Sequence, residues 1–281
     1  TRKYYDLTDE RSAHINKLKG DLHTVFPQYL DVFCDVTGKT STMILRQYGT
    51  PDKILRGHKK TMIEKISKAS ERYEKLCAAA NAAKTFGCQI DSIYFNIFLT
   101  LDLVEKLDSA LDSILNRIRQ LITFNKNEKF IQQIKLLNTI PGVGFLTAVT
   151  IMCEIGDFSA FRNPKQLFAY FGLDPEVNES GKFVGTQLHM SKRGSRIARR
   201  AIFAVALASI RTKRNGEGIN PYLRKYYELK SGQKPKMVAI GAVMHKVCNI
   251  VFAVLRDEKA FELRSPEEHC KQYQRPALAA A

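Results

Sequence analysis

The chain has 281 residues, of which 44% are hydrophobic and 10% aromatic, enough for one large packed domain or two ordinary ones. Lys and Arg number 44 against 28 Asp and Glu, so the formal net charge is +16. No uninterrupted apolar run approaches the roughly 20 residues that cross a bilayer, and the six cysteines form neither a C-x-x-C pair nor a Cys/His zinc pattern. These features exclude full disorder and disfavour a membrane or zinc protein, so we expect no membrane partner and no metal in this chain.

Most of the positive charge lies in one segment. Residues 182–236 contain fourteen basic and two acidic residues, a net +12 of the total +16 in about a fifth of the chain. A solvated surface rarely concentrates charge in this way without a polyanionic partner. We therefore expect nucleic acid as the partner. The dispersed cysteines are typical of a reducing cytoplasm, where we expect the chain to lie with the nucleoid.

The first part of the chain is predicted to be helical. Residues 1–25 form a polar helix that Pro27 stops, and Gly38, Gly49 and Pro51 break the following stretch into short helices and turns. We treat 1–57 as an N-terminal helical linker region.

Two heptad segments follow and predict a coiled-coil hairpin over 58–127, with a turn at 85–87. Apolar residues alternate three and four apart in both arms. The first arm carries Met62, Ile66, Ala69, Tyr73, Leu76, Ala80 and Ala83. The second carries Ile90, Ile93, Ile97, Thr100, Val104, Leu107, Leu111, Ile114, Ile118 and Leu121. The seam packs within one subunit or also recruits a second subunit into a dimer or tetramer, and the sequence favours neither.

A further helical domain is predicted over 128–265. Helices are expected over 145–155, 165–170, 195 to about 213, and about 236–255, with a short hairpin or extended loop at 180–190. A tail over 266–281 ends in an alanine-rich stretch that is either natural or added. The expected fold is mainly α: a long antiparallel coiled-coil hairpin, then a helical domain with at most one short β-hairpin.

Residues 137–144, Leu-Asn-Thr-Ile-Pro-Gly-Val-Gly, have the form of a helix-hairpin-helix motif. Gly142 and Gly144 allow positive φ and a close approach of backbone to phosphate, and the next helix offers its N-terminal N–H groups. Such contacts position DNA without reading its sequence. The alternative is a tight interhelical turn that only needs glycine.

The segment 189–195, His-Met-Ser-Lys-Arg-Gly-Ser, precedes a helix with a basic face. A serine at such a junction faces helix N–H groups and cations that hold a phosphate and stabilise charge developing on it. Alternatively, Ser191 or Ser195 only caps the helix, and the cations only bind DNA. The cations expected to contact nucleic acid are Lys192, Arg193, Arg196, Arg199, Arg200, Arg211, Lys213 and Arg214.

Several ordered motifs across about 130–261 resemble the C-terminal transposase domain of the insertion-sequence-one-ten family, which includes the Piv-type DNA invertases. Besides 137–144 they are Glu-Ile-Gly-Asp (154–157), Ala-Tyr-Phe-Gly-Leu-Asp-Pro (169–175), Ser-Gly (180–181), Met-Ser-Lys-Arg-Gly (190–194) and Arg-Arg-Ala (199–201). Residues 1–125 look like the coiled-coil stretch between the two catalytic parts of that family.

The resemblance implies a site-specific recombinase, guided by a structured bridge RNA, that forms multimers and cleaves and rejoins DNA. It places the catalytic serine at Ser191. It also implies a RuvC-like domain with four acidic ligands for a divalent metal (Mg), and that motif is absent here. We therefore expect an N-terminal neighbour and expect this chain alone to be inactive.

Three other classes of protein also bind nucleic acid through basic segments. A tyrosine recombinase would use Tyr222, Tyr226 or Tyr227, but no histidine has Arg three residues later. A zinc or acidic-triad nuclease is disfavoured because acidic residues are sparse near the basic segment. The main alternative is a helix-hairpin-helix module that binds DNA or structured RNA without chemistry of its own.

Overall fold

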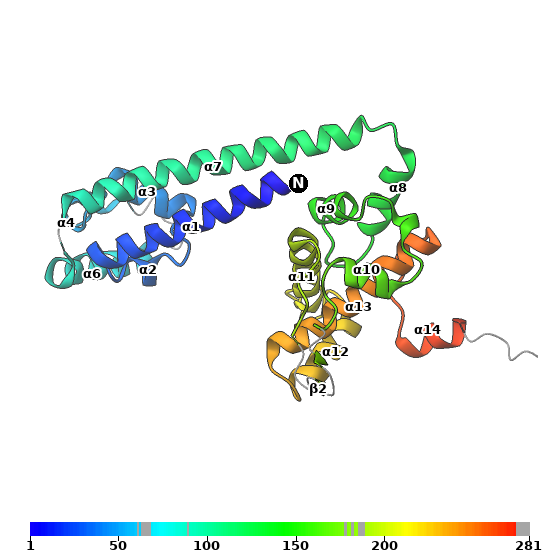
Figure 1. Cartoon of the computed structure of the whole chain (residues 1–281). Coiled ribbons are helices and arrows are strands. Elements are labelled where there is room, and N and C mark those ends of the chain that lie inside the picture. The colour runs from blue at the N-terminus through cyan, green and yellow to red at the C-terminus, as the bar shows by residue number, and fades with distance from the viewer. Residues whose placement is uncertain are drawn as a thin grey trace, which may run out of the picture. The chain divides into compact units, whose positions relative to one another are not determined.

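The computed structural model describes residues 1–60, 62, 69–88, 90–176, 179–180, 183–184 and 189–273. Within these ranges the chain is mainly α-helical, as predicted, and it divides into two units, Arg2–Arg119 and Gln120–Ala281 (Figure 1). The four regions expected from the sequence stay predictions.

The first unit contains α1 (Arg2–Val25), α2 (Tyr29–Val32), α3 (Lys39–Gln47), α4 (Pro51–Arg56), α6 (Ala69–Phe86) and most of α7 (Asp91–Thr123). The second contains α8 (Glu128–Leu137), α9 (Phe145–Ile155), the 3-10 turn η1 (Phe158–Ala160), α10 (Pro164–Tyr170), β1 (Glu179–Ser180), β2 (Phe183–Val184), α11 (Arg196–Ile210), α12 (Pro221–Ser231), α13 (Lys236–Asp257) and α14 (Pro266–Tyr273).

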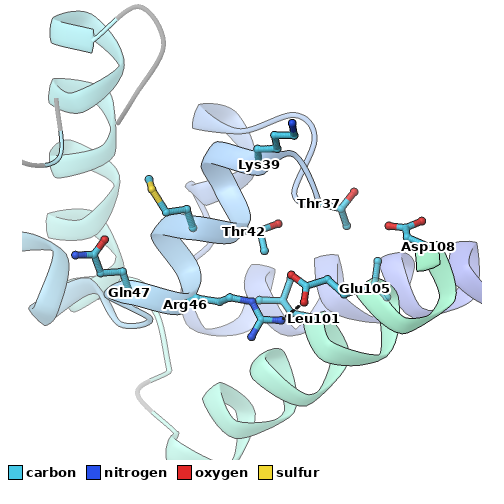
Figure 2. Close-up of a pocket in the computed structure, with 10 residues that line it drawn as sticks. Thr37, Lys39, Thr42, Arg46, Gln47, Leu101, Glu105 and Asp108 are labelled. Carbon is cyan, nitrogen blue, oxygen red and sulfur yellow. Dashed lines mark hydrogen bonds and ion pairs between the residues drawn. The ribbon is translucent and has the colours of Figure 1, made fainter. Parts of the chain in front are cut away.

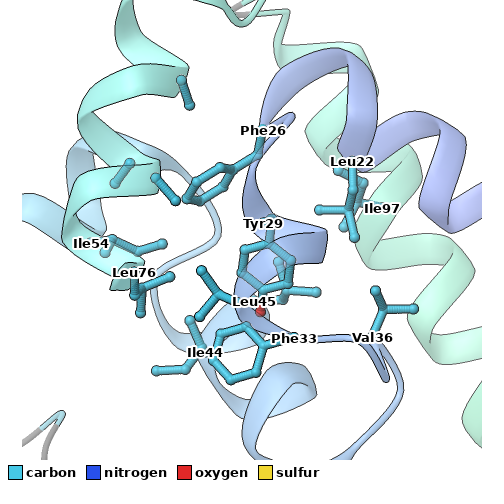
Figure 3. Close-up of a cluster of buried hydrophobic side chains, with 14 of the residues drawn as sticks. Leu22, Phe26, Tyr29, Phe33, Val36, Ile44, Leu45, Ile54, Leu76 and Ile97 are labelled. Atoms are coloured by element: carbon cyan, nitrogen blue, oxygen red, sulfur yellow. The ribbon is translucent and has the colours of Figure 1, made fainter. Parts of the chain in front are cut away.

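The helices of the first unit share one apolar cluster (Figure 3). It includes Leu22 of α1, Ile44 of α3, Ile54 of α4, Leu76 of α6 and Ile97 of α7. Full burial of such a side chain contributes about 1.5–3 kcal/mol. The short helices here are therefore held by shared packing, since isolated helices of their length are marginal in water.

Five of the ten predicted seam positions over 90–121 are buried within this chain, whereas Ile90 and Leu121 are exposed. α1 lies beside α7 (Figure 1), where Arg11 donates to the carboxylate of Asp108. The buried seam positions are Ile97, Thr100, Val104, Leu111 and Ile118. α6 packs against α4 and α2. These contacts do not single out α6 as the partner of α7, so a coiled coil of these two helices stays a prediction.

The second unit is organised around α13, which packs against α8, α10, α11 and α12. By length and composition alone α13 is, within the described ranges, the one helix apolar enough to cross a membrane. Polar residues such as His245 and Lys246 interrupt its apolar run, so counting uninterrupted runs missed it. Ten of its side chains are buried, and this packing accounts for its apolar composition.

Of the predicted hairpin over 180–190, the structure describes the start and the last two residues. β1 and β2 pair antiparallel, with Glu179 opposite Val184 and Ser180 opposite Phe183. Residues 181–182 and 185–188 lie outside the described part of the chain.

Helix boundaries follow the sequence signals closely, except at the end of α11 and at two helices that were not predicted, α12 and α14, the latter within the expected tail. α9 spans the predicted 145–155, but α11 ends at Ile210 rather than near Lys213. The chain turns back after Ile210, where Thr212 bridges Gly218 and the N–H of Ile219 donates to the carbonyl of Arg211 at 2.9 Å. α12 was not predicted, although Asn220-Pro221 is a standard helix start: the Asn220 side chain accepts from the N–H of Leu223.

Candidate functional site

Two loops of the second unit pair to form the candidate site. Residues 172–176 follow α10, and residues 189–193 precede α11. Their backbones run antiparallel, with Pro175 opposite Met190. Three N–H···O=C bonds cross between them: from Lys192 to Gly172 (3.1 Å), from Ser191 to Asp174 (2.8 Å) and from Glu176 to His189 (2.7 Å). The backbone alone therefore ties the two loops together.

Ser191 lies in this pairing with its side chain half-buried. Its Oγ donates a hydrogen bond of 2.6 Å to Oδ1 of Asp174. In the sequence, Asp174 is only part of the Gly-Leu-Asp-Pro turn, and no role was predicted for it. Its pairing with Ser191 depends on how the two loops meet, which no local pattern indicates.

Lys192, the next residue, has a φ of 54°. This left-handed conformation is uncommon for a residue with a side chain and costs about 1–2 kcal/mol. Such strain persists where surrounding structure imposes it, often at functional sites. The side chain of Lys192 is exposed beside Ser191.

Two glycines let the strands approach closely on the side toward α11. A Cβ on Gly194 would lie 1.9 Å from the carbonyl oxygen of Tyr170, and Gly172 has a φ of +64°. Arg199 closes the same junction, since its Nη1 donates to the carbonyl oxygens of Phe171 (3.1 Å) and Gly194 (2.8 Å). Burial lowers the pKa of Arg199. This guanidinium therefore holds the loop, a role that the sequence pattern did not predict.

Ser195 is the N-cap of α11, as one sequence alternative proposed for it. Its Oγ accepts from the N–H of Ala198 at 3.1 Å and donates to Oε2 of Glu154 at 2.7 Å. Glu154, near the end of α9, is buried with 6% of its surface exposed. The hydroxyl of Ser195 is thus used twice in joining α9 to α11.

The other predicted cations lie in the loop before α11, on α11 itself and in the loop after it. Lys192, Arg193 and Arg196 are exposed, and Arg200 is half-buried. Arg211, Lys213 and Arg214 are exposed in the loop that bridges back at Gly218, where Lys213 pairs with Glu217 at 3.7 Å. The chain therefore offers one cationic surface at the start of α11 and a second at its end.

Gly142 and Gly144 join α8 to α9, and their surroundings differ. Gly142 has a φ of +95°, and a Cβ there would lie 2.8 Å from Oγ of Ser209, which donates to the carbonyl of Pro141. Gly144 is the exposed N-cap of α9, and a Cβ there would meet nothing within 4 Å. Packing against α11 thus explains Gly142, whereas Gly144 leaves the start of α9 open.

A pocket in the first unit is a weaker candidate (Figure 2). Arg46 is among its lining residues and donates to Asp102 at 2.6 Å and to Glu105 at 2.9 Å. These partners also raise the pKa of Arg46. The charges here largely compensate one another, so the pocket offers less to a phosphate than the loops before α11.

Residues 134–228 match the family described as the Transposase IS116/IS110/IS902 family. This segment is similar to that transposase family. It contains both paired loops, the turn at Gly142 and every cation predicted to bind nucleic acid.

Individual relatives agree with this family. The chain is 30% identical over 177 residues to the pilin gene-inverting protein of Moraxella bovis, covering 63% of this chain and 52% of that protein. It is 26% identical over 188 residues to the transposase for insertion sequence element IS1111A of Coxiella burnetii, covering 65% and 50%. It is 23% identical over 272 residues to an uncharacterized 43.6 kDa protein of insertion element IS110 in Streptomyces coelicolor, covering 93% and 63%. The chain thus spans about half to two thirds of these relatives.

Proposed function

We propose that this chain is part of a site-specific DNA recombinase that cleaves and rejoins DNA through a phosphoserine link at Ser191. The family and the names of its relatives, a transposase and a gene-inverting protein, support the reaction class. A serine ester of the DNA phosphate conserves the phosphodiester energy, so strands can be rejoined without ATP.

One observation carries the choice of serine. Ser191 lies in a loop next to the strained Lys192 and before the basic start of α11. The side-chain hydrogen bond described for its Oγ is the one to the carboxylate of Asp174. Ser195 instead caps α11 and bonds Glu154. A nucleophile needs a hydroxyl that can turn toward a phosphate without unravelling a helix end, and Ser191 meets that requirement.

The surrounding cations would bind the phosphate. Lys192, Arg193, Arg196 and Arg200 lie within nine residues of Ser191 in the sequence, and charge-assisted hydrogen bonds from such groups stabilise charge developing on phosphate oxygens. The α8–α9 turn, with Gly144 at its open end, would hold a neighbouring backbone phosphate as a helix-hairpin-helix does.

The family resemblance also implies a divalent metal. Within the described ranges no group of three or more His, Cys, Asp or Glu side chains is placed to hold a metal ion. These residues do not fit such a site, so an implied metal would have to be held by another part of the protein, and the roles proposed below are those of this chain's own side chains. If the metal is held by a RuvC-like domain, this chain should be inactive without that domain.

Three further expectations belong to the same proposal: guidance by a structured RNA, self-association into a dimer or tetramer, and action at the bacterial nucleoid. The net charge of +12 over 182–236 supports the binding of a second polyanion, an RNA, in addition to DNA. For self-association, light scattering over a range of concentrations is the test. A monomer at high concentration would contradict it and would leave the α7 seam as internal packing.

The second candidate function is a nucleic-acid-binding module that catalyses no reaction. It is favoured by α8 and α9, two helices that contact each other and are joined by a short turn. Ser191→Ala discriminates the two. In a full-length protein that carries this chain, incubated with copurifying RNA and with DNA spanning its element's ends, Ser191→Ala should abolish cleavage and leave DNA affinity nearly unchanged. The covalent adduct should map to Ser191 by peptide mass spectrometry. An adduct on Ser195 or a tyrosine, or cleavage without any adduct, would refute the assignment.

A further inference from the structure

We propose that Asp174 is the general base for Ser191, accepting the hydroxyl proton as Oγ attacks the DNA phosphate. This rests on the proposed function, because it takes Ser191 as the nucleophile. It adds a second residue to the site, contributed by a different loop.

The geometry supports a direct proton transfer. Ser191 Oγ donates to Asp174 Oδ1 at 2.6 Å, which is within the range expected for a hydroxyl and a positioned base. The serine and the aspartate are seventeen residues apart, so the contact is produced by tertiary structure. Asp174 is half-buried between α10 and the loop before α11, where water is partly excluded.

The side-chain bond is not needed to hold the loops together. Three backbone bonds already cross between them, one of them from the N–H of Ser191 to the carbonyl of Asp174 itself. Replacing only the carboxylate leaves all three in place. The Ser191–Asp174 side-chain pair is therefore free to serve chemistry.

The step balances with water as its one further reactant. A bond forms between Oγ of Ser191 and phosphorus, and the bond from phosphorus to the departing deoxyribose oxygen breaks. The Oγ proton passes to the carboxylate of Asp174, and the departing oxygen, on the opposite side of phosphorus, takes a proton from water and leaves as a hydroxyl. In the rejoining step the same groups act in reverse, because the deoxyribose hydroxyl attacks and Ser191 recovers its proton.

Two variants of Asp174 and one control test the role. Asp174→Asn keeps the size and an acceptor oxygen but cannot take a proton, whereas Asp174→Glu keeps a carboxylate on a longer side chain. Glu176→Gln is the matched control, because it removes one exposed negative charge from the same loop without touching Ser191. All variants are made in the full-length protein that carries this chain. Each is purified with the RNA that copurifies with it and is then incubated with DNA that spans the ends of the element.

The measurements are melting temperature, the DNA concentration at half-saturation, and the rate of covalent adduct formation at saturating DNA. Asp174→Asn should leave the first two within error and lower the rate about 10²- to 10⁴-fold, the range of a general base. Asp174→Glu should recover part of the rate, and Glu176→Gln should match the wild type.

Two results would overturn the proposal. One is adduct formation by Asp174→Asn at nearly the wild-type rate. The other is a parallel loss of melting temperature, affinity and rate that Asp174→Glu fails to restore, since the side chain would then be only a structural link. If Ser191→Ala still forms the adduct, the proposed function itself fails. If Ser191→Ala loses adduct formation but Asp174→Asn keeps it, only the proposed role of Asp174 is refuted, and the role of Ser191 stands.

Discussion

Ser195 and Glu154 are joined by a 2.7 Å hydrogen bond although they are forty-one residues apart. The serine also accepts from the first turn of α11, and the glutamate is buried near the end of α9. One hydroxyl therefore links a helix start to a buried carboxylate on a neighbouring helix.

Ser195→Ala should destabilise the second unit by about 2–5 kcal/mol. A lost helix cap costs about 0.5–2 kcal/mol, and a hydrogen bond to a charged group contributes about 1.5–3 kcal/mol. Chemical denaturation measures the effect. Ser231→Ala is the control, because its exposed hydroxyl only bonds back to the carbonyl of Glu228 and its loss should cost at most about 0.5 kcal/mol. Equal effects of the two changes would contradict this account.

Gly142→Ala and Gly144→Ala should differ sharply. Alanine at 142 would adopt a strained φ and press on Ser209, which should cost about 1–3 kcal/mol of unfolding free energy. Alanine at 144 should leave stability within about 1 kcal/mol, because its Cβ meets nothing. If the start of α9 contacts a phosphate, Gly144→Ala should still weaken DNA binding. Unchanged binding would exclude that contact.

The loop after α11 should contribute to nucleic-acid affinity through charge. Arg214→Ala should weaken binding and reduce the slope of log affinity against log salt by about one, as expected for one lost phosphate contact. Titrations at several salt concentrations give the slope. Lys106→Ala removes an exposed cation of α7 outside the basic segment and should leave the slope unchanged. A wild-type affinity that does not depend on salt would refute a phosphate-based interaction.

His245 should make stability depend on pH. Burial lowers the pKa of His245 from the ordinary 6.5. A hydrogen bond with the backbone of Leu173 opposes this shift, and the positive charge of Lys246 adds to it. Because the unfolded chain binds the proton more readily, the contribution is present above about pH 6.5 and is lost as pH falls through the folded-state pKa. Melting temperatures from about pH 8 to about pH 5 should therefore fall less in His245→Gln than in the wild type. The melting temperature of His189→Gln, which keeps His245, should fall as much as that of the wild type. The same fall in all three proteins would contradict the assignment.

The apolar cluster of the first unit can be tested with two leucines of α7. Leu101 is 1% exposed, whereas Leu99 is 48% exposed. Leu101→Ala should cost about 2–5 kcal/mol, and Leu99→Ala at most about 0.5–1 kcal/mol. A large loss of stability in Leu99→Ala would show that this exposed face is covered in solution.

The local chemistry of the sequence determined most of the helices and part of the site. Apolar spacing predicted α9 and α13, because periodicity acts over a few residues. The sequence before α11 offered Ser191 or Ser195 as a cap, and the structure has Ser195 there. Local signals also indicated the basic start of α11. The ordered motifs indicated the family, although the serine chemistry at Ser191 stays a proposal.

Tertiary structure decided which of these residues meet. The Ser191–Asp174 and Ser195–Glu154 pairs, the bonding of Arg199 to two loop carbonyls, and the packing of α1 beside α7 join segments distant in sequence. A heptad pattern indicates that a face is apolar, but it does not identify the helix that covers the face. Likewise, a turn sequence such as Gly-Leu-Asp-Pro gives its local conformation, whereas the partner of its carboxylate depends on how α10 and α11 pack.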